Sequence, residues 1–384
     1  MFSYVVKRFS YLQQSLLHFI LQPFGFFSRI ISFIEKLTCA KKCPSDLESN
    51  IPFDIRAGPS TCETYTVCLQ PQYDLDILGV GASGQVYNVS DQIVLKACRI
   101  FAPPSSDSSR RDLWHYASDT LFHFNLLKDE RTVLQQLQNK PHPHIMKAID
   151  TGHREGLYLR KYRQLPAEVK ATQARRIRLY RDIADALCHL HSLGIVHADV
   201  RVDNVLFDDQ FSAILCDFSA ASPCGQPNLV FPDLPLPING PSPILTEASD
   251  MFALASLIFQ MEHGFAPGLS LENGRLALPE LTSGNQGIDE VIQMAWLGNY
   301  SRTSDMLHQL AFIDSQMNEY AESTEVPSDL EDLNLQILDW KKHRICNFGC
   351  VLEGILSEEQ LKVLAERHDM DPDADLRFTH YILP

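Results

Sequence analysis

Three side chains that could bind a metal ion and move a proton lie close together in the middle of the chain. Asp199 and Asn204 belong to the stretch HADVRVDNVLF, and Asp217 follows a second apolar run. Apolar residues on both sides of an Asp-Asp pair predict two strands joined by a turn across residues 205–216. Such a hairpin would place Asn204 and Asp217 where they can share a divalent metal, with Asp199 beside it to accept a proton. Phosphoryl transfer needs this layout.

A glycine-rich segment lies upstream of this stretch. Gly79, Gly81 and Gly84 have the spacing Gly-x-Gly-x-x-Gly, which dinucleotide-binding folds also use. A dinucleotide-binding turn would open a helix, but residues 85–89 alternate with a period of two and are β-branched, which predicts a strand. The pattern therefore favours a hairpin that closes over phosphate groups, with Lys96 in the strand that follows.

Lys96 needs a carboxylate partner, because an unpaired lysine in a buried strand is costly. Residues 128–145 contain a predicted helix in which Leu134 and Leu137 lie four and seven residues after Glu130. These spacings place all three on one helical face, so we expect Glu130 to point inward toward Lys96. Asp129 is the competing candidate, but it lies off that face.

Together these motifs, in this order, resemble the eukaryotic protein kinase superfamily over residues 73–312. The resemblance implies an α+β fold with two lobes, a small β-rich N-lobe and a mainly helical C-lobe. It also implies ATP and Mg²⁺ as cofactors and a protein as substrate. The positions that the resemblance assigns to nucleotide binding are Leu78, Gly79, Gly81, Gly84, Val86, Val94, Lys96 and Leu206.

The same resemblance implies a role for each polar residue of the site. Lys96, paired with Glu130, would hold the α- and β-phosphates. Asn204 and Asp217 would bind Mg²⁺, and Asp199 would orient the acceptor hydroxyl. Arg201 stands where serine/threonine kinases usually have lysine, and its guanidinium would neutralise charge on the transferred phosphate.

Several positions depart from the family pattern. Ala198 replaces the arginine that normally precedes the catalytic aspartate and pairs with a phosphorylated activation loop, so we expect no such switch. Ser219 replaces the glycine after Asp217-Phe218. An Ala-Pro-Glu motif is missing before Asp250, which resembles the aspartate that braces the catalytic loop. The usual partner arginine of that motif is represented by Arg302.

The complete metal and phosphate set favours an active protein kinase, with serine or threonine preferred over tyrosine as acceptor. Two alternatives stay open. A pseudokinase or scaffold would bind nucleotide without efficient transfer, and a small-molecule phosphotransferase of the same fold would also lack the peptide-docking motif.

Composition limits the partners and the compartment. A net charge of −15 argues against a nucleic-acid-binding surface. Ten cysteines in 384 residues are too sparse for a disulfide scaffold, which favours an intracellular, cytoplasmic protein.

The remaining segments carry expectations of their own. Residues 1–38 are hydrophobic and basic without a run of 18 apolar residues, which predicts amphipathic pieces that contact a membrane peripherally, target an organelle, or pack on the protein. Residues 39–72 have the composition of a linker. Residues 102–118 have that of an inserted loop, and residues 313–384 form an acidic extension with one predicted helix at 357–368.

Overall fold

A computed structural model describes the chain from Cys68 onward. The expectations for residues 1–38, and most of those for 39–72, therefore lie outside the described residues. Within the described part, no helix is long and apolar enough to cross a membrane. The described ranges are 68–81, 84–105, 107–164, 172–228, 238–272, 275–317 and 330–371.

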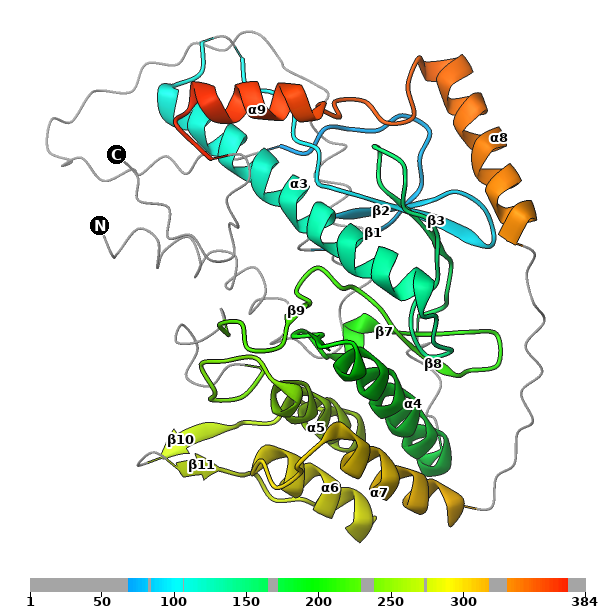
Figure 1. The fold of residues 1–384 in the computed structure, drawn as a ribbon, viewed down its shortest axis with the longest axis vertical. Coiled ribbons are helices and arrows are strands. Elements are labelled where there is room, and N and C mark those ends of the chain that lie inside the picture. The colour runs from blue at the N-terminus through cyan, green and yellow to red at the C-terminus, as the bar shows by residue number, and fades with distance from the viewer. Residues whose placement is uncertain are drawn as a thin grey trace, which may run out of the picture. The chain divides into compact units, whose positions relative to one another are not determined.

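An antiparallel sheet with the strand order β1-β2-β3-β5-β4 forms the first lobe (Figure 1). Its register places Val86 opposite Lys96, so both side chains lie on the same face of the sheet. The β-branched residues of β3 are fully or nearly buried, which explains why this strand forms the centre of the sheet. The strands are β1 (Ile77–Val80), β2 (Gln85–Asn88), β3 (Ile93–Ala97), β4 (Ala148–Asp150) and β5 (Leu157–Arg160).

Helix α3 (Arg110–Asn139) begins earlier than the sequence predicts. The expectation of an inserted loop over residues 102–118 is wrong from Arg110 onward, because Ser109 caps the helix by accepting a hydrogen bond from the backbone N–H of Asp112 at 3.1 Å. A single helix therefore runs from the serine-rich segment to the turn at residues 140–145.

The second lobe is mainly helical, as the family resemblance implies. Helix α4 is amphipathic and is followed by Gly194, whose φ of 73° is in the left-handed region. Its apolar face packs with those of α5, α6 and α7 in one large buried core. The helices are α4 (Gln173–Ser192), α5 (Glu247–His263), α6 (Gln286–Trp296) and α7 (Thr303–Ser315).

Short strands carry the polar residues of the second lobe. The predicted hairpin across residues 205–216 is confirmed, with Leu206 opposite Ile214. A single turn of 3₁₀ helix at Val202–Asn204 leads into it. The strands are β6 (Ile195–Val196), β7 (Val205–Phe207), β8 (Ala213–Leu215), β9 (Ser222–Pro223), β10 (Ser270–Glu272) and β11 (Arg275–Ala277).

The C-terminal extension contains two described helices, α8 (Leu330–Phe348) and α9 (Glu358–Arg367), whereas the sequence predicted only the second. Leu333, Ile337 and Trp340 of α8 follow helical spacing and pack on residues of the sheet. The acidic composition of the extension concealed this apolar stripe. Both helices lie against the first lobe (Figure 1).

Candidate active site

Lys96 lies at the centre of a buried ionic cluster. Its ammonium nitrogen is 2.7 Å from Glu130 Oε2, 2.8 Å from Glu130 Oε1 and 2.9 Å from Asp217 Oδ1. Strand β3 supplies the lysine, helix α3 supplies the glutamate, and the segment after β8 supplies the aspartate. The predicted contact between Lys96 and Glu130 is present. The cluster joins the two lobes at one point.

The charges of this cluster stabilise one another. Burial alone would lower the pKa of Lys96, but the Asp217 and Glu130 carboxylates reverse this and raise it above its usual range. Burial would likewise raise the pKa of Asp217, but Lys96 and the Ser219 hydrogen bonds hold it well below the ordinary value. Both groups therefore carry their full charge at neutral pH.

Asp217 presents its two carboxylate oxygens differently. Lys96 donates to Oδ1, and so do the Ser219 backbone N–H at 3.3 Å and the Ser219 hydroxyl at 2.8 Å. All three hydrogen bonds described for this carboxylate thus fall on Oδ1. The residue has a φ of 63°, so the backbone at this position is in the left-handed region that aspartate visits more readily than most residues.

Asp199 and Asn204 form a second pair in the loop before β7. The Asn204 amide Nδ2 donates to the Asp199 backbone carbonyl at 2.9 Å and to Asp199 Oδ2 at 2.8 Å. Burial raises the pKa of Asp199, and Asp217 adds to this effect, whereas Arg201 opposes it. Because the amide nitrogen is used inside the loop, its oxygen is the end that can receive a cation.

Arg201 lies next to this pair. Its Nε is 3.6 Å from Asp199 Oδ2, and its Nη2 is 3.8 Å from Asp203 Oδ2. The guanidinium therefore lies beside the carboxylate that the sequence assigned to the acceptor hydroxyl, where it can neutralise negative charge.

Asp250 supports the loop from below. This fully buried aspartate at the start of α5 accepts hydrogen bonds from the backbone N–H groups of His197 at 2.7 Å and Ala198 at 2.9 Å. The bracing role that the sequence suggested for Asp250 thus has a direct geometric basis. Its third partner is His191 Nε2 at 2.9 Å, while Arg302 has an exposed side chain at the start of α7.

The glycine-rich hairpin contributes the opposite side of the site. Gly84 must be glycine, since a Cβ there would come within 2.2 Å of the Ala97 carbonyl oxygen. Arg99 donates two hydrogen bonds to the Gly81 carbonyl, at 2.9 Å from Nε and 2.6 Å from Nη2, and so fixes the hairpin to the end of β3. Space is open around Gly79, so packing does not dictate its identity.

The apolar residues assigned to the nucleotide differ in their surroundings. Val94 is buried and Val86 is half-buried, and both lie near Lys96 in the sheet. Leu206 is half-buried in β7, between two buried neighbours. Leu78 is 45% exposed in β1, close to an irregularity in the register with β2. Three of the four therefore line the interior of the two lobes, and Leu78 lies at the sheet edge.

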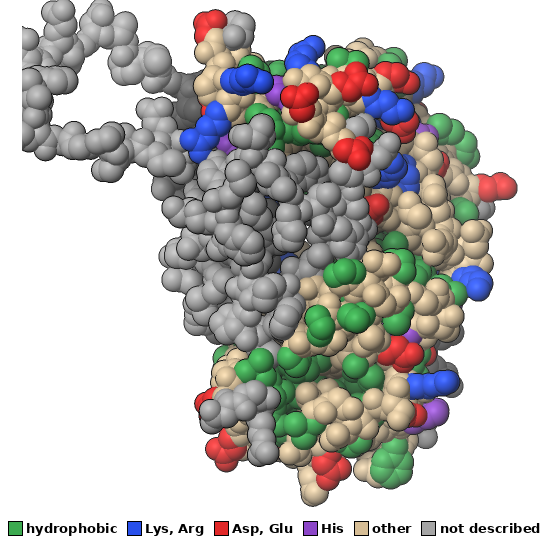
Figure 2. All heavy atoms as spheres, turned by 60° about the vertical axis from the view of Figure 1, so that its left-hand side comes forward, with side chains coloured by type: hydrophobic (Ala, Val, Ile, Leu, Met, Phe, Trp, Pro, Cys, Tyr) green, Lys and Arg blue, Asp and Glu red, His purple; other side chains and the backbone are tan. Residues whose placement is uncertain are grey.

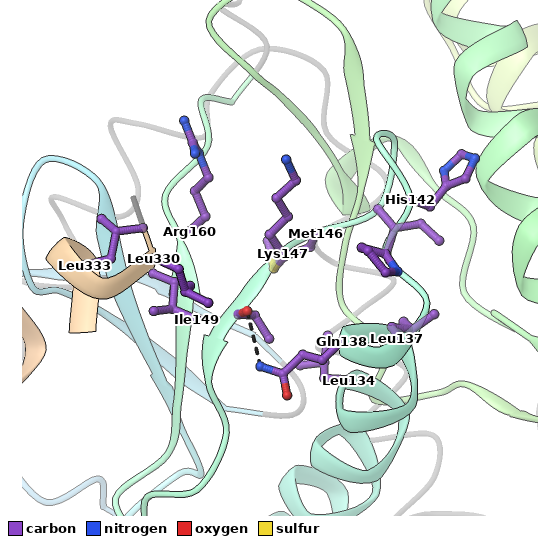
Figure 3. A pocket seen from close by; sticks show the side chains of 13 residues that line it. Leu134, Leu137, Gln138, His142, Met146, Lys147, Ile149, Arg160, Leu330 and Leu333 are labelled. Atoms are coloured by element: carbon purple, nitrogen blue, oxygen red, sulfur yellow. Dashed lines mark hydrogen bonds between the residues drawn. The ribbon is translucent and has the colours of Figure 1, made fainter. Parts of the chain in front are cut away.

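A cavity of about 340 Å³ lies elsewhere, between the end of α3, strands β4 and β5 and the first turn of α8 (Figure 3). Leu134, Leu137 and Leu333 are among its lining residues. None of the predicted catalytic, phosphate-binding or metal-binding residues lines it. The cavity is therefore separate from the polar site, although it is large enough to hold a small molecule.

Sequence reasoning missed two residues that support the site. Asn239, which is buried, donates from Nδ2 to the Ala198 carbonyl at 2.7 Å and so joins the segment after Asp217 to the catalytic loop. His191 binds Asp250. The only sequence signal for either is a polar residue in an apolar context, and nothing in the sequence indicates which distant backbone group it contacts.

Comparison with known proteins identifies the family. The protein kinase domain model matches residues 73–343. CBL-interacting protein kinase 22 of Oryza sativa subsp. japonica is 26% identical over 233 residues, which cover 52% of this chain and 50% of that protein. The serine/threonine-protein kinase ppk8 of Schizosaccharomyces pombe is 26% identical over 160 residues, covering 38% of this chain and 28% of the relative.

A bacterial relative gives the same result. The serine/threonine-protein kinase PkaB of Streptomyces coelicolor is 29% identical over 167 residues, which cover 36% of this chain and 38% of that protein. The chain thus spans half or less of the length of these curated relatives. Since the family model covers well over half of the chain, the protein belongs to the protein kinase domain family.

Proposed function

We propose that this protein is an ATP-dependent protein kinase that transfers the γ-phosphate of ATP to a hydroxyl group of a protein substrate. The observation that carries the proposal is the contact of Lys96 with both Glu130 and Asp217, at 2.7–2.9 Å. An ammonium group fixed between two carboxylates is held in one place, from which it can bind phosphate oxygens without reorganisation.

Magnesium is the metal that the oxygen donors of the site fit. Asn204 would offer its amide oxygen and Asp217 its carboxylate, and both are hard donors of the kind that Mg²⁺ prefers. The concentration of the Asp217 hydrogen bonds on Oδ1 supports this assignment, because Oδ2 stays available for a cation. Bound Mg²⁺ would neutralise charge on the phosphates.

The acceptor side of the reaction depends on Asp199. Its carboxylate is held by Asn204 and lies beside Arg201, so it can orient a hydroxyl and accept its proton while the guanidinium neutralises phosphate charge. The names of the relatives, serine/threonine-protein kinases among them, support serine or threonine as the acceptor.

The experiment is phosphate transfer from labelled Mg-ATP, both to the protein itself and to a generic basic protein. We expect Lys96→Met and Asp199→Asn each to lower transfer by about a thousandfold, because each removes a group that acts on the transferred phosphate or its acceptor. Asp203→Asn is the matched control, since Asp203 lies in the same loop with its side chain 74% exposed. Its transfer rate should stay within about twofold of the natural protein.

Nucleotide binding separates the alternatives. Absence of transfer to proteins, with a melting temperature that still rises with Mg-ATP, would contradict the proposal and favour a pseudokinase that binds nucleotide. Transfer to small alcohols but not to proteins would assign a small-molecule phosphotransferase. Transfer that survives both substitutions would remove Lys96 and Asp199 from the mechanism.

A further inference from the structure

Helix α3 is packed at its two ends by different parts of the chain. Its C-terminal half carries Glu130 and buries Leu127 and Leu134 in the main core of the protein. Its N-terminal half buries Ala117 and Leu121 in a separate small cluster. Strand β4 and helix α9 are the elements that α3 contacts most extensively. The N-terminal half therefore depends on α9 for its packing.

Helix α9 meets α3 with an apolar face of its own. Leu361 and Ala365 are buried in the cluster with Ala117 and Leu121, whereas Val363 on another side of α9 is 52% exposed. Figure 1 shows α9 beside the first turns of α3. Acidic and basic side chains are interspersed over the upper end of the face drawn in Figure 2. The helix is thus amphipathic, with its apolar side toward α3.

The position of α9 is fixed by the first lobe itself. Arg154 donates to the Ile355 carbonyl at 2.6 Å, just before the helix begins. Gln72 and Glu353 exchange two hydrogen bonds, from Gln72 Nε2 to the Glu353 carbonyl at 2.9 Å and from the Glu353 N–H to Gln72 Oε1 at 2.7 Å. These contacts attach the segment that carries α9 to the lobe, so the helix can hold α3 against a fixed support.

Movement at one end of α3 reaches the other end. The helix is continuous over 30 residues, and Leu121 and Glu130 are separated by nine residues, or about 14 Å along the axis. The contact of Glu130 with Lys96 is short, at 2.7–2.8 Å, and a hydrogen bond is lost when such a distance grows by about 1 Å. A small tilt of the helix is therefore enough to separate the pair.

We propose that α9 positions the active site: Leu361 and Ala365 hold α3 in the orientation that brings Glu130 to Lys96. These two are positioning residues, since neither touches the site. The inference rests on the proposed kinase function for its activity readout, but the position of Glu130 can be measured independently. The Phe218 N–H donates to Glu130 Oε1 at 3.3 Å, so its exchange rate reports whether the glutamate is in place.

The first test compares two truncations on α9 in the full chain. We expect Leu361→Ala to lower phosphate transfer about tenfold, because it opens a gap against Ala117 and Leu121. Val363→Ala is the matched control and should leave transfer unchanged, since its side chain is exposed. Leu361→Met, which preserves volume, should recover most of the activity. Assays run well below the melting temperature of each variant exclude a general loss of fold.

The second test asks whether α9 acts through Glu130. In a double-mutant cycle, Leu361→Ala should lower transfer in the natural background but cause no further loss when Glu130→Gln has already broken the pair. Hydrogen exchange should show faster exchange at Phe218 and across residues 126–137 in Leu361→Ala, with no change in Val363→Ala.

Each outcome decides the proposal. Equal losses from Leu361→Ala in both backgrounds would overturn it, because α9 would then act independently of Glu130. Unchanged exchange at Phe218 in Leu361→Ala would overturn it as well. If the natural protein transfers no phosphate, the proposed kinase function fails, and the exchange measurement alone then supports or overturns the role of α9.

Discussion

The residues around Lys96 and the segment that follows Asp217 differ in how far they keep the family pattern. Around Lys96, each polar side chain of the family motifs contacts another one: Lys96 contacts Glu130 and Asp217, and Asn204 contacts Asp199. A change in one of these residues would therefore disturb its neighbour. After Asp217, two hydrogen bonds come from side chains that the family pattern does not include. Ser219, where the family has glycine, donates to the Asp217 carboxylate, and Asn239 donates to the Ala198 carbonyl.

This difference indicates which positions of the fold tolerate a change of residue type. A group that must meet a phosphate or a cation has no substitute, because the geometry of the ligand fixes its position. A group that only supports a loop can be replaced by any donor that reaches the same carbonyl. Asn239 reaches the Ala198 carbonyl, and it thereby connects the segment to the catalytic loop without the arginine that the family usually has at position 198.

The largest expected effect comes from Asp250, which braces the catalytic loop. Asp250→Ala would leave the N–H groups of His197 and Ala198 buried without their acceptor, at a cost of about 3–5 kcal/mol. We expect the free energy of unfolding, measured by urea denaturation, to fall by this amount, and phosphate transfer to be lost. Asp289→Ala on α6 is a control at a less buried position, and an equal loss there would contradict a special role for Asp250.

The connection through Asn239 can be broken separately. Asn239→Ala removes the hydrogen bond to the Ala198 carbonyl, and we expect transfer to a protein substrate to fall about tenfold while nucleotide binding is retained. Asn228→Ala is the matched control, because Asn228 is also buried in this segment but donates to the Ser242 carbonyl instead. If both variants lose the same activity, the contact with the catalytic loop is not what matters.

Ser219 lies where the two regions meet, next to the carboxylate of Asp217. Ser219→Ala removes the hydroxyl donor to Asp217 Oδ1 but keeps the backbone donor. We expect the Mg²⁺ concentration needed for half of the nucleotide-induced rise in melting temperature to increase about three- to tenfold, because one hydrogen bond to a charged group is lost. Ser222→Ala, in the same segment, should have no such effect. An unchanged Mg²⁺ requirement in Ser219→Ala would show that the hydroxyl does not position Asp217.

The sequence predicted the polar site better than its supports. Spacing alone placed Glu130 on the helical face that meets Lys96, because helical periodicity is a local property. The hairpin across residues 205–216 was also predicted from a local pattern, the apolar runs on both sides of an Asp-Asp pair. The partner of Asn239 lies 41 residues away in sequence. No local pattern reports such a contact, which depends on how the whole second lobe packs.

The C-terminal extension was underestimated because composition and periodicity conflict there. The sequence predicted an acidic extension with one helix at 357–368, yet Leu333, Ile337 and Trp340 form an apolar stripe that meets the sheet. Acidic residues of the same helix, Glu331, Asp332 and Asp339, hide this stripe from an estimate based on composition. The start of α3 was missed for a related reason. The serine-rich run has the composition of a loop, but its last serine, Ser109, caps the helix.

The smallest expected effect concerns the ionic contact that attaches α8. Lys341 Nζ lies 2.6 Å from Glu155 Oε1, and the Tyr158 hydroxyl donates to the same oxygen at 2.9 Å. Burial would raise the pKa of Glu155, but the Lys341 and Tyr158 hydrogen bonds outweigh it and lower the pKa. A carboxylate with a lowered folded-state pKa stabilises the protein above its unfolded pKa of about 4.3, and this contribution is lost as the pH falls through the lowered value.

We therefore expect Glu155→Gln to lower the melting temperature by about 1–2 °C at pH 7, with a smaller difference below pH 4. A difference that grows toward acid pH would contradict the lowered pKa and, with it, the role of this pair in holding α8 to the sheet.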